Sequence, residues 1–138
     1  MSDSDSLGMR YLAAWDTHIP SDVGAFMDDD VDFEDLPLGQ KLHGRKEVEE
    51  FVALFDQTLS SDYRFTLVTE FVTESTMALE WTVSGTHDRT SPALPATGKP
   101  FNIRGATIAR LSNGKITYNR DYSDMADFLR QVGVLPAD

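Results

Sequence analysis

The sequence predicts an α+β fold in which helices cover the concave face of a strongly curved antiparallel sheet. Apolar residues recur at helical spacing as far as about Leu59, and from there they alternate with polar ones. The alternating segments are long and follow one another along the chain. Helices followed by such a run of strands are typical of α+β domains. Long strands twist and curl, so the sheet and its helices can enclose a cavity.

The N-terminal segment has the spacing of an amphipathic helix from about residue 6 to residue 18. One face carries Leu7, Tyr11, Ala14, Trp15 and His18. Pro20 is expected to end this helix, because proline does not continue one. Ser21 is expected to cap a short second helix, whose apolar residues are Val23, Phe26 and Met27.

A first strand and a third helix are predicted next. After the acidic run at 28–30, Val31, Phe33 and Asp35 alternate with Asp32 and Glu34, which indicates a strand. The Leu-Pro-Leu-Gly segment at 36–39 indicates a turn. Residues 45–59 then show a helical stripe, which consists of Val48, Phe51, Val52, Phe55 and Leu59.

Four further strands and a final helix complete the prediction. The strands are expected at about 63–72, 77–88, 101–111 and 116–122. Their inward faces are predicted to carry Phe65, Leu67, Phe71, Met77, Leu79, Trp81, Val83, Phe101 and Ile103. The helix is expected from about Asp124 to Val132, with Gly133 after its end. Asp124 is expected to cap its first turn.

Composition and charge exclude several classes of function. The chain of 138 residues has the size of one domain and a formal net charge of −11, which repels nucleic acid and anionic lipid. No apolar run approaches the roughly 20 residues of a membrane helix, and the start is unlike a signal peptide, so we expect a cytoplasmic protein. Cysteine is absent, and the three histidines lack ligand spacing. Glycine fingerprints of nucleotide sites are also absent. We therefore expect neither a metal nor a cofactor.

Asp35 is the first candidate catalytic residue. It shares a strand face with Val31 and Phe33, so alternation points its carboxyl group inward. Desolvation there would raise its pKa and make it useful as an acid or base near neutral pH. In the alternative interpretation, Asp35 stands at the strand end and caps the following turn.

Asp121 is the second candidate, and its orientation depends on the register of the last hairpin. A tight two-residue turn at Asn113-Gly114 places it beside Ala106, on the outer face. A three-residue loop with a bulge places it beside Gly105, on the inner face. The residues favour the tight turn, because Ile116, Tyr118 and Tyr122 are more apolar than Thr117, Asn119 and Asp121.

His87 and Trp81 are further candidates on the 77–88 strand. His87 continues the inward face of Trp81 and Val83, which predicts a place at a pocket rim as a general base or hydrogen-bond donor. A purely structural histidine fits the same pattern. Trp81 fits the core, or a stacking surface for a flat ligand.

Several short motifs resemble the SnoaL-like polyketide cyclases and ester cyclases of the nuclear-transport-factor-two-like superfamily. The motifs are Tyr11-Leu-Ala-Ala-Trp15, Phe33-Glu-Asp35, Gly44-Arg45, Gly85-Thr-His87, Pro95-Ala-Thr-Gly-Lys99, Arg104-Gly105, Asn113-Gly-Lys-Ile116, Arg120-Asp-Tyr122 and Leu129-Arg-Gln-Val-Gly133. The resemblance covers nearly the whole chain. It implies a cone-shaped α+β barrel, a buried apolar pocket and a homodimer formed through the outer face of the sheet.

The resemblance also implies a function. In the cyclases an aspartate on the last strand acts as acid/base in an aldol ring closure, and Asp121 matches it, which favours the bulged register. The relatives that hydrolyse limonene epoxide use an Arg and a second Asp where this chain has Trp81 and Val83. Their water-positioning Tyr and Asn appear here as Phe33 and Asp35. The resemblance to the cyclases is therefore the better guide to the reaction.

We thus expect a cofactor-free enzyme that acts on a small apolar carbonyl compound. Asp121 would remove a proton, and Asp35 or Asn119 would stabilise the developing oxyanion. The expected pocket walls are Tyr11, Trp15, Phe33, Trp81, Val83, Ile103, Gly105, Thr107 and Asn119. Two alternatives remain open at this point: a noncatalytic module that binds an apolar ligand, and an epoxide hydrolase with an altered catalytic set.

Overall fold

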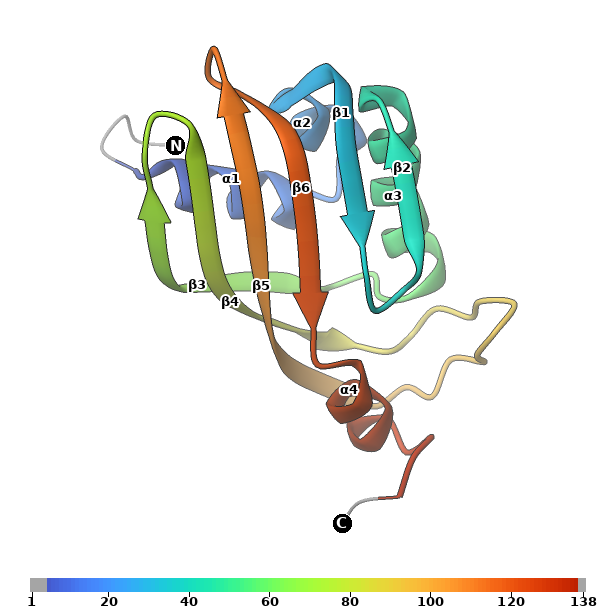
Figure 1. Cartoon of the computed structure of the whole chain (residues 1–138). Helices are drawn as coiled ribbons and strands as arrows, with labels where there is room; N and C mark the ends of the chain where they lie inside the picture. Colours follow the sequence, from blue (N-terminus) through green and yellow to red (C-terminus); the bar gives the residue numbers. More distant parts are fainter. Residues whose placement is uncertain (1–4, 137–138) are drawn as a thin grey trace.

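A computed structural model describes residues 5–136 of the chain as one curved six-stranded sheet with helices packed on it (Figure 1). Along the chain the elements are α1 (Leu7–Asp16), α2 (Pro20–Gly24), β1 (Met27–Asp35), β2 (Gln40–His43), α3 (Arg45–Thr58), β3 (Arg64–Val72), β4 (Thr76–Thr86), β5 (Pro100–Ser112), β6 (Lys115–Ser123) and α4 (Met125–Gln131). The predicted α+β class is confirmed. Within the described range no helix is long and apolar enough to cross a membrane.

The strand order in the sheet is β2-β1-β6-β5-β4-β3. The four strands expected between residues 63 and 122 form antiparallel pairs, as predicted. The expectation of an entirely antiparallel sheet was wrong at one place, because β1 runs parallel to β6. The short strand β2 was not predicted, and it pairs with the free edge of β1. Parallel pairing brings the ends of β1 and β6 together, so that Asp35 lies opposite Asp121.

The helices cover one face of the sheet (Figure 1). Helix α1 packs on β3, and α3 packs on α2 and β1. Trp15 of α1 packs against α3, because its ring centroid lies 6.3 Å from that of Phe51 and 5.8 Å from that of Phe55. The short helix α4 packs on β5 beyond the end of β6. Asp124 caps α4 by accepting from the Asp127 backbone N–H, as predicted.

Several expected boundaries of the N-terminal helices were wrong. Helix α1 ends at Asp16 and not near His18, and Ser6 is its N-cap. Pro20 starts α2, whose N-cap is Ile19 and not Ser21. Proline suits this position because its missing N–H is not needed in the first turn of a helix. Phe26 and Met27, assigned to the second helix, lie after it, and Met27 begins β1.

Phe71 is exposed, contrary to the predicted pattern of β3. Its side chain is 71% exposed, whereas Phe65 and Leu67 on the same strand are half-buried. The register between β3 and β4 shifts by one residue between Leu67 and Thr69. Such a bulge reverses which residues face inward, so Phe71 lies on the outer face.

Candidate active site

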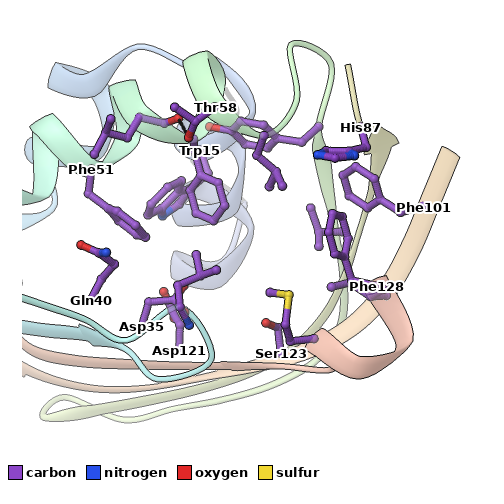
Figure 2. A pocket seen from close by; sticks show the side chains of 18 of the residues that line it. Trp15, Asp35, Gln40, Phe51, Thr58, His87, Phe101, Asp121, Ser123 and Phe128 are labelled. Atoms are coloured by element: carbon purple, nitrogen blue, oxygen red, sulfur yellow. Dashed lines mark hydrogen bonds between the residues drawn. The ribbon is translucent and has the colours of Figure 1, made fainter. Parts of the chain in front are cut away.

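A largely apolar cavity of about 480 Å³ lies between the concave face of the sheet and the helices (Figure 2). Its size suits a small organic ligand. Its acidic and imidazole side chains lie at two places: Asp35 and Asp121 are together on one wall, and His87 is at a distance from them. The cavity walls contain no lysine or arginine among residues 5–136.

The hairpin of β5 and β6 aims Asp121 into this cavity. Ser112 pairs with Lys115, so Asn113 and Gly114 form the tight turn of the first predicted register, and both have positive φ. One pair further, the register shifts by one residue, which leaves Thr117 as the extra residue of a bulge. Asp121 consequently lies opposite Thr107, on the inner face.

Neither predicted register was therefore correct in full. The turn is the tight one, and Asp121 has neither Ala106 nor Gly105 opposite it. The inward orientation agrees with the bulged alternative, but the bulge lies within β6 and not in the loop. The bulge also explains why the apolar pattern favoured the tight-turn register with Asp121 outward. Ile116, before the bulge, is buried, whereas Tyr122, after it, is exposed.

A hydrogen-bond network fixes the Asp121 carboxyl group. Its Oδ1 accepts from the Thr107 hydroxyl at 2.7 Å and from Asn119 Nδ2 at 3.1 Å. Thr107 in turn accepts from Trp81 Nε1 at 2.9 Å, and the Tyr11 hydroxyl donates to Asn119 Oδ1 at 3.1 Å. No described side chain donates to the second oxygen, Oδ2, within hydrogen-bond distance. One oxygen is thus held by two donors, and the other has no donor among the described side chains.

Asp35 fits both sequence interpretations. Its side chain is only 6% exposed and lines the cavity, as the alternation of β1 predicted. Its Oδ1 also accepts the Leu38 backbone N–H at 3.2 Å, as expected of a residue that caps a turn. Figure 2 shows Asp35 and Asp121 close together at the same wall.

Burial raises the pKa of both carboxyl groups. The pKa of Asp121 rises to about 7, mainly by desolvation, with a further increase from the charge of Asp35; the bond from Thr107 opposes the rise. The pKa of Asp35 rises to about 6, again by desolvation, and the Leu38 amide opposes it. Arg120, which precedes Asp121 in the sequence, pairs with Asp32 and Glu34 instead. A carboxyl pair at this wall can therefore hold a proton near neutral pH.

His87 lies just after β4 and is 1% exposed. Figure 2 shows its ring at the end of the cavity away from the two aspartates, near Phe101 and Phe128. Burial lowers its pKa, and the nearby Asp88 opposes this effect. His87 does not lie with the carboxyl pair, so the three predicted catalytic residues form two separate groups.

The other predicted pocket residues divide into two sets. The cavity is lined by Tyr11, Trp15, Trp81, Val83, Ile103 and Thr107. Phe33, Gly105 and Asn119 do not line it. Asn119 is fully buried and supports Asp121, and Gly105 leaves room for the Trp81 ring, which a Cβ atom would overlap.

Several lining residues escaped the sequence analysis. Tyr63 lines the cavity, is 2% exposed, and its hydroxyl has no hydrogen-bond partner in the described part of the chain. Leu94 reaches the cavity from the connection between β4 and β5, which has no regular secondary structure. Periodicity gives no signal for a loop residue. The apolar stripe of the last helix did give one, and its Phe128 lines the cavity.

No group of three or more His, Asp or Glu side chains in residues 5–136 is arranged to hold a metal ion.

Several solved structures have the same fold as this chain. Among solved structures, a hypothetical protein with a ketosteroid isomerase-like fold from Catenulispora acidiphila DSM 44928, crystallised with trimethylamine, has a TM-score of 0.82 and 20% identity, covering 98% of this chain and 96% of that one. A candidate polyketide cyclase from Xanthomonas campestris pv. campestris has a TM-score of 0.76 and 24% identity, covering 92% and 94%. A candidate SnoaL-like polyketide cyclase from Jannaschia sp. CCS1 has a TM-score of 0.75 and 14% identity, covering 99% and 100%.

At these identities the structural likeness shows the fold alone. A search of curated proteins gave no match. The family model described as SnoaL-like polyketide cyclase matches residues 7–132, which is nearly the whole chain. The chain belongs to the SnoaL-like polyketide cyclase family.

Proposed function

We propose that this protein performs cofactor-free acid/base chemistry of the cyclase, isomerase or lyase type on a small apolar carbonyl compound. The observation that supports this proposal most is the pair of adjacent carboxyl groups, Asp35 and Asp121, at the wall of an apolar cavity. Desolvation raises the pKa of each into the range where a carboxyl group can exchange protons near neutral pH.

The two carboxyl groups act as a pair that holds one proton. Asp35 and Asp121 lie opposite each other on paired strands, so their like charges disfavour ionisation of both. The apparent pKa values of about 6 and about 7 therefore belong to the pair. The higher value belongs to Asp121, so most singly protonated molecules carry the proton there; the active form is the other arrangement of the same pair, with Asp121 as the carboxylate and Asp35 as the carboxylic acid. Asp121 is assigned the base because its Oδ1 is anchored by two donors and leaves Oδ2 for the substrate.

The proton transfer follows from this arrangement. Asp121 Oδ2 accepts a proton from the carbon next to the substrate carbonyl, and the C–H electron pair becomes the double bond of an enolate. The Asp35 acid donates to the carbonyl oxygen as negative charge develops on it. In a ring closure, the enolate carbon would then attack a second carbonyl of the same molecule. The apolar walls exclude water from the enolate.

Exchange of α-hydrogens with solvent tests the proposal without knowledge of the natural substrate. Alpha-tetralone, a bicyclic ketone with an enolisable carbon, is incubated with the protein in D₂O, and deuterium uptake is followed by NMR. General acid–base catalysis contributes about 10²–10⁴ in rate, so Asp121→Asn should lose about that factor. Asp35→Asn should lose less, because an amide still donates to the oxygen.

Glu34→Gln provides the matched control, because Glu34 lies on the same strand as Asp35 and pairs with Arg120, away from the cavity. Its exchange rate should equal that of the wild type. Exchange that is no faster with wild-type protein than with Asp121→Asn would contradict the proposal. A larger loss in Asp35→Asn than in Asp121→Asn would reverse the two roles.

The apolar walls also favour a second candidate, a noncatalytic module that binds an apolar metabolite. Its signature would be tight retention of an apolar ligand that neither aspartate variant weakens, together with no exchange above the solvent rate. The epoxide-hydrolase alternative lacks such support, because Trp81 and Val83 offer no group that activates water.

A further inference from the structure

His87 is held in one orientation by the connection that follows it. Its backbone N–H donates to Lys99 O at 2.9 Å, and its carbonyl accepts from Gly98 N at 2.7 Å. Its ring Nδ1 lies 3.2 Å from the Thr97 backbone N and 3.0 Å from the Thr97 hydroxyl oxygen. Gly98 has a φ of 71°, which glycine adopts readily, so residues 97–99 can make these contacts to His87 without backbone strain.

These contacts determine where the ring carries its proton. A backbone N–H is only a donor, so Nδ1 must present a lone pair to Thr97. In the neutral ring the proton is then on Nε2. The neutral form is favoured because burial lowers the pKa of His87.

The Nε2–H group has no acceptor in the described part of the chain. The ring lines the cavity and meets Phe128 edge-on at 5.6 Å between centroids. Phe128 in turn packs against Phe101 at 5.1 Å. Arg45 Nε and the Tyr63 hydroxyl are the buried side-chain polar atoms without a partner among residues 5–136, so His87 Nε2 is not sealed off but opens into the cavity. A donor that opens into an apolar cavity is a position that an acceptor on a ligand would satisfy.

We propose that His87 Nε2–H binds an uncharged acceptor oxygen, a carbonyl or ether, at the end of the substrate remote from the reacting carbonyl. This inference rests on the proposed function for the position of the reacting end. His87 is thereby a binding residue and not a general base, because its only lone pair on nitrogen is occupied by Thr97.

The position of His87 defines a class of substrate. His87 bonds to Lys99, next to the start of β5, whereas Asp121 pairs with Thr107, eight residues further along. The path along the curved strand is at most about 26 Å, and the straight separation is shorter. An elongated apolar compound with an oxygen at each end would contact both groups. A compound with one oxygen would contact only one of them.

A pair of ketones tests this site by affinity. One is alpha-tetralone with a methoxy group para to its carbonyl, and the other carries an ethyl group of similar shape there. Binding is read by fluorescence, because both Trp15 and Trp81 line the cavity. Wild-type protein should bind the methoxy ketone about three- to tenfold more tightly, as expected for one net hydrogen bond.

Two substitutions distinguish the role of Nε2 from that of Nδ1. His87→Asn keeps an acceptor near Thr97 and removes the donor at Nε2, so it should bind both ketones equally. His87→Gln reaches the Nε2 position with its amide and should keep the preference. Equal binding of the two ketones by wild-type protein, absence of binding included, would overturn the site, as would a preference that persists in His87→Asn.

The affinity ratio and the deuterium exchange are independent readouts. A methoxy preference without exchange would leave the His87 site intact and refute the proposed acid/base function. Exchange without a methoxy preference would refute the His87 site alone.

Discussion

Replacing Asp35 by asparagine should lower the pKa of Asp121. Asp35 lies opposite Asp121 across the parallel β1–β6 pair, and its charge raises the pKa of Asp121. Two unit charges about 5 Å apart at an effective dielectric constant of about 20 repel by about 3 kcal/mol. This corresponds to at most about two pKa units, and solvent in the cavity reduces it. The pKa of Asp121, about 7 in the wild type, should therefore fall by about one unit.

NMR titration of ¹³C-labelled aspartate carboxyl groups measures this change without any substrate. The Asp121 resonance is assigned by its absence in Asp121→Asn, and it is followed in wild type, Asp35→Asn and Glu34→Gln. Glu34 bonds to Arg120 away from the cavity, so Glu34→Gln should leave the Asp121 titration in place. An Asp121 pKa that stays the same or rises in Asp35→Asn would show that the carboxyl groups are not coupled.

Three further substitutions have expected outcomes. Thr107→Val removes a donor that lowers the pKa of Asp121, so NMR titration should find that pKa raised, and an unchanged value would refute the assigned bond. Gly105→Ala places a Cβ atom in the Trp81 ring and should destabilise the fold by about 1–3 kcal/mol in urea unfolding; no loss would show that the ring moves freely. Tyr63→Phe removes a buried hydroxyl that has no partner in the described residues, so its Tm should rise by about 3 °C, and a fall would reveal an unrecognised partner.

Local patterns in the sequence predicted most of the elements. The stripe from Val48 to Leu59 gave α3 to within one residue, and strict alternation gave the strands β3 to β6 to within two. Both signals depend on neighbours in the chain, because a buried face imposes a period of 3.6 or 2. Asp35 followed from the same logic, and its inward orientation is confirmed.

The features that assemble the candidate site are not local. A bulge at Thr117 turns Asp121 inward, and the residues around it give no hint of that extra position. The parallel contact between β1 and β6 joins strands that are far apart in the sequence, and nothing in either strand specifies the partner. The connection that holds His87 has no periodicity at all. Alternation therefore identified Asp35, and the family resemblance favoured Asp121, but neither could place the two acids side by side.

The burial of two acids also limits the chemistry that this site can perform. A folded-state pKa above the unfolded value of about 3.9 means that folding stability decreases as pH rises, and that the loss continues through the folded pKa. For Asp35, with a pKa of about 6, the loss is about 3 kcal/mol once it is ionised. Domains of this kind are stable by only about 5–15 kcal/mol. One ionised carboxyl group is thus tolerated, whereas ionising both would remove a large part of the stability. The fold therefore favours the singly protonated pair, which is the state that acid/base chemistry requires.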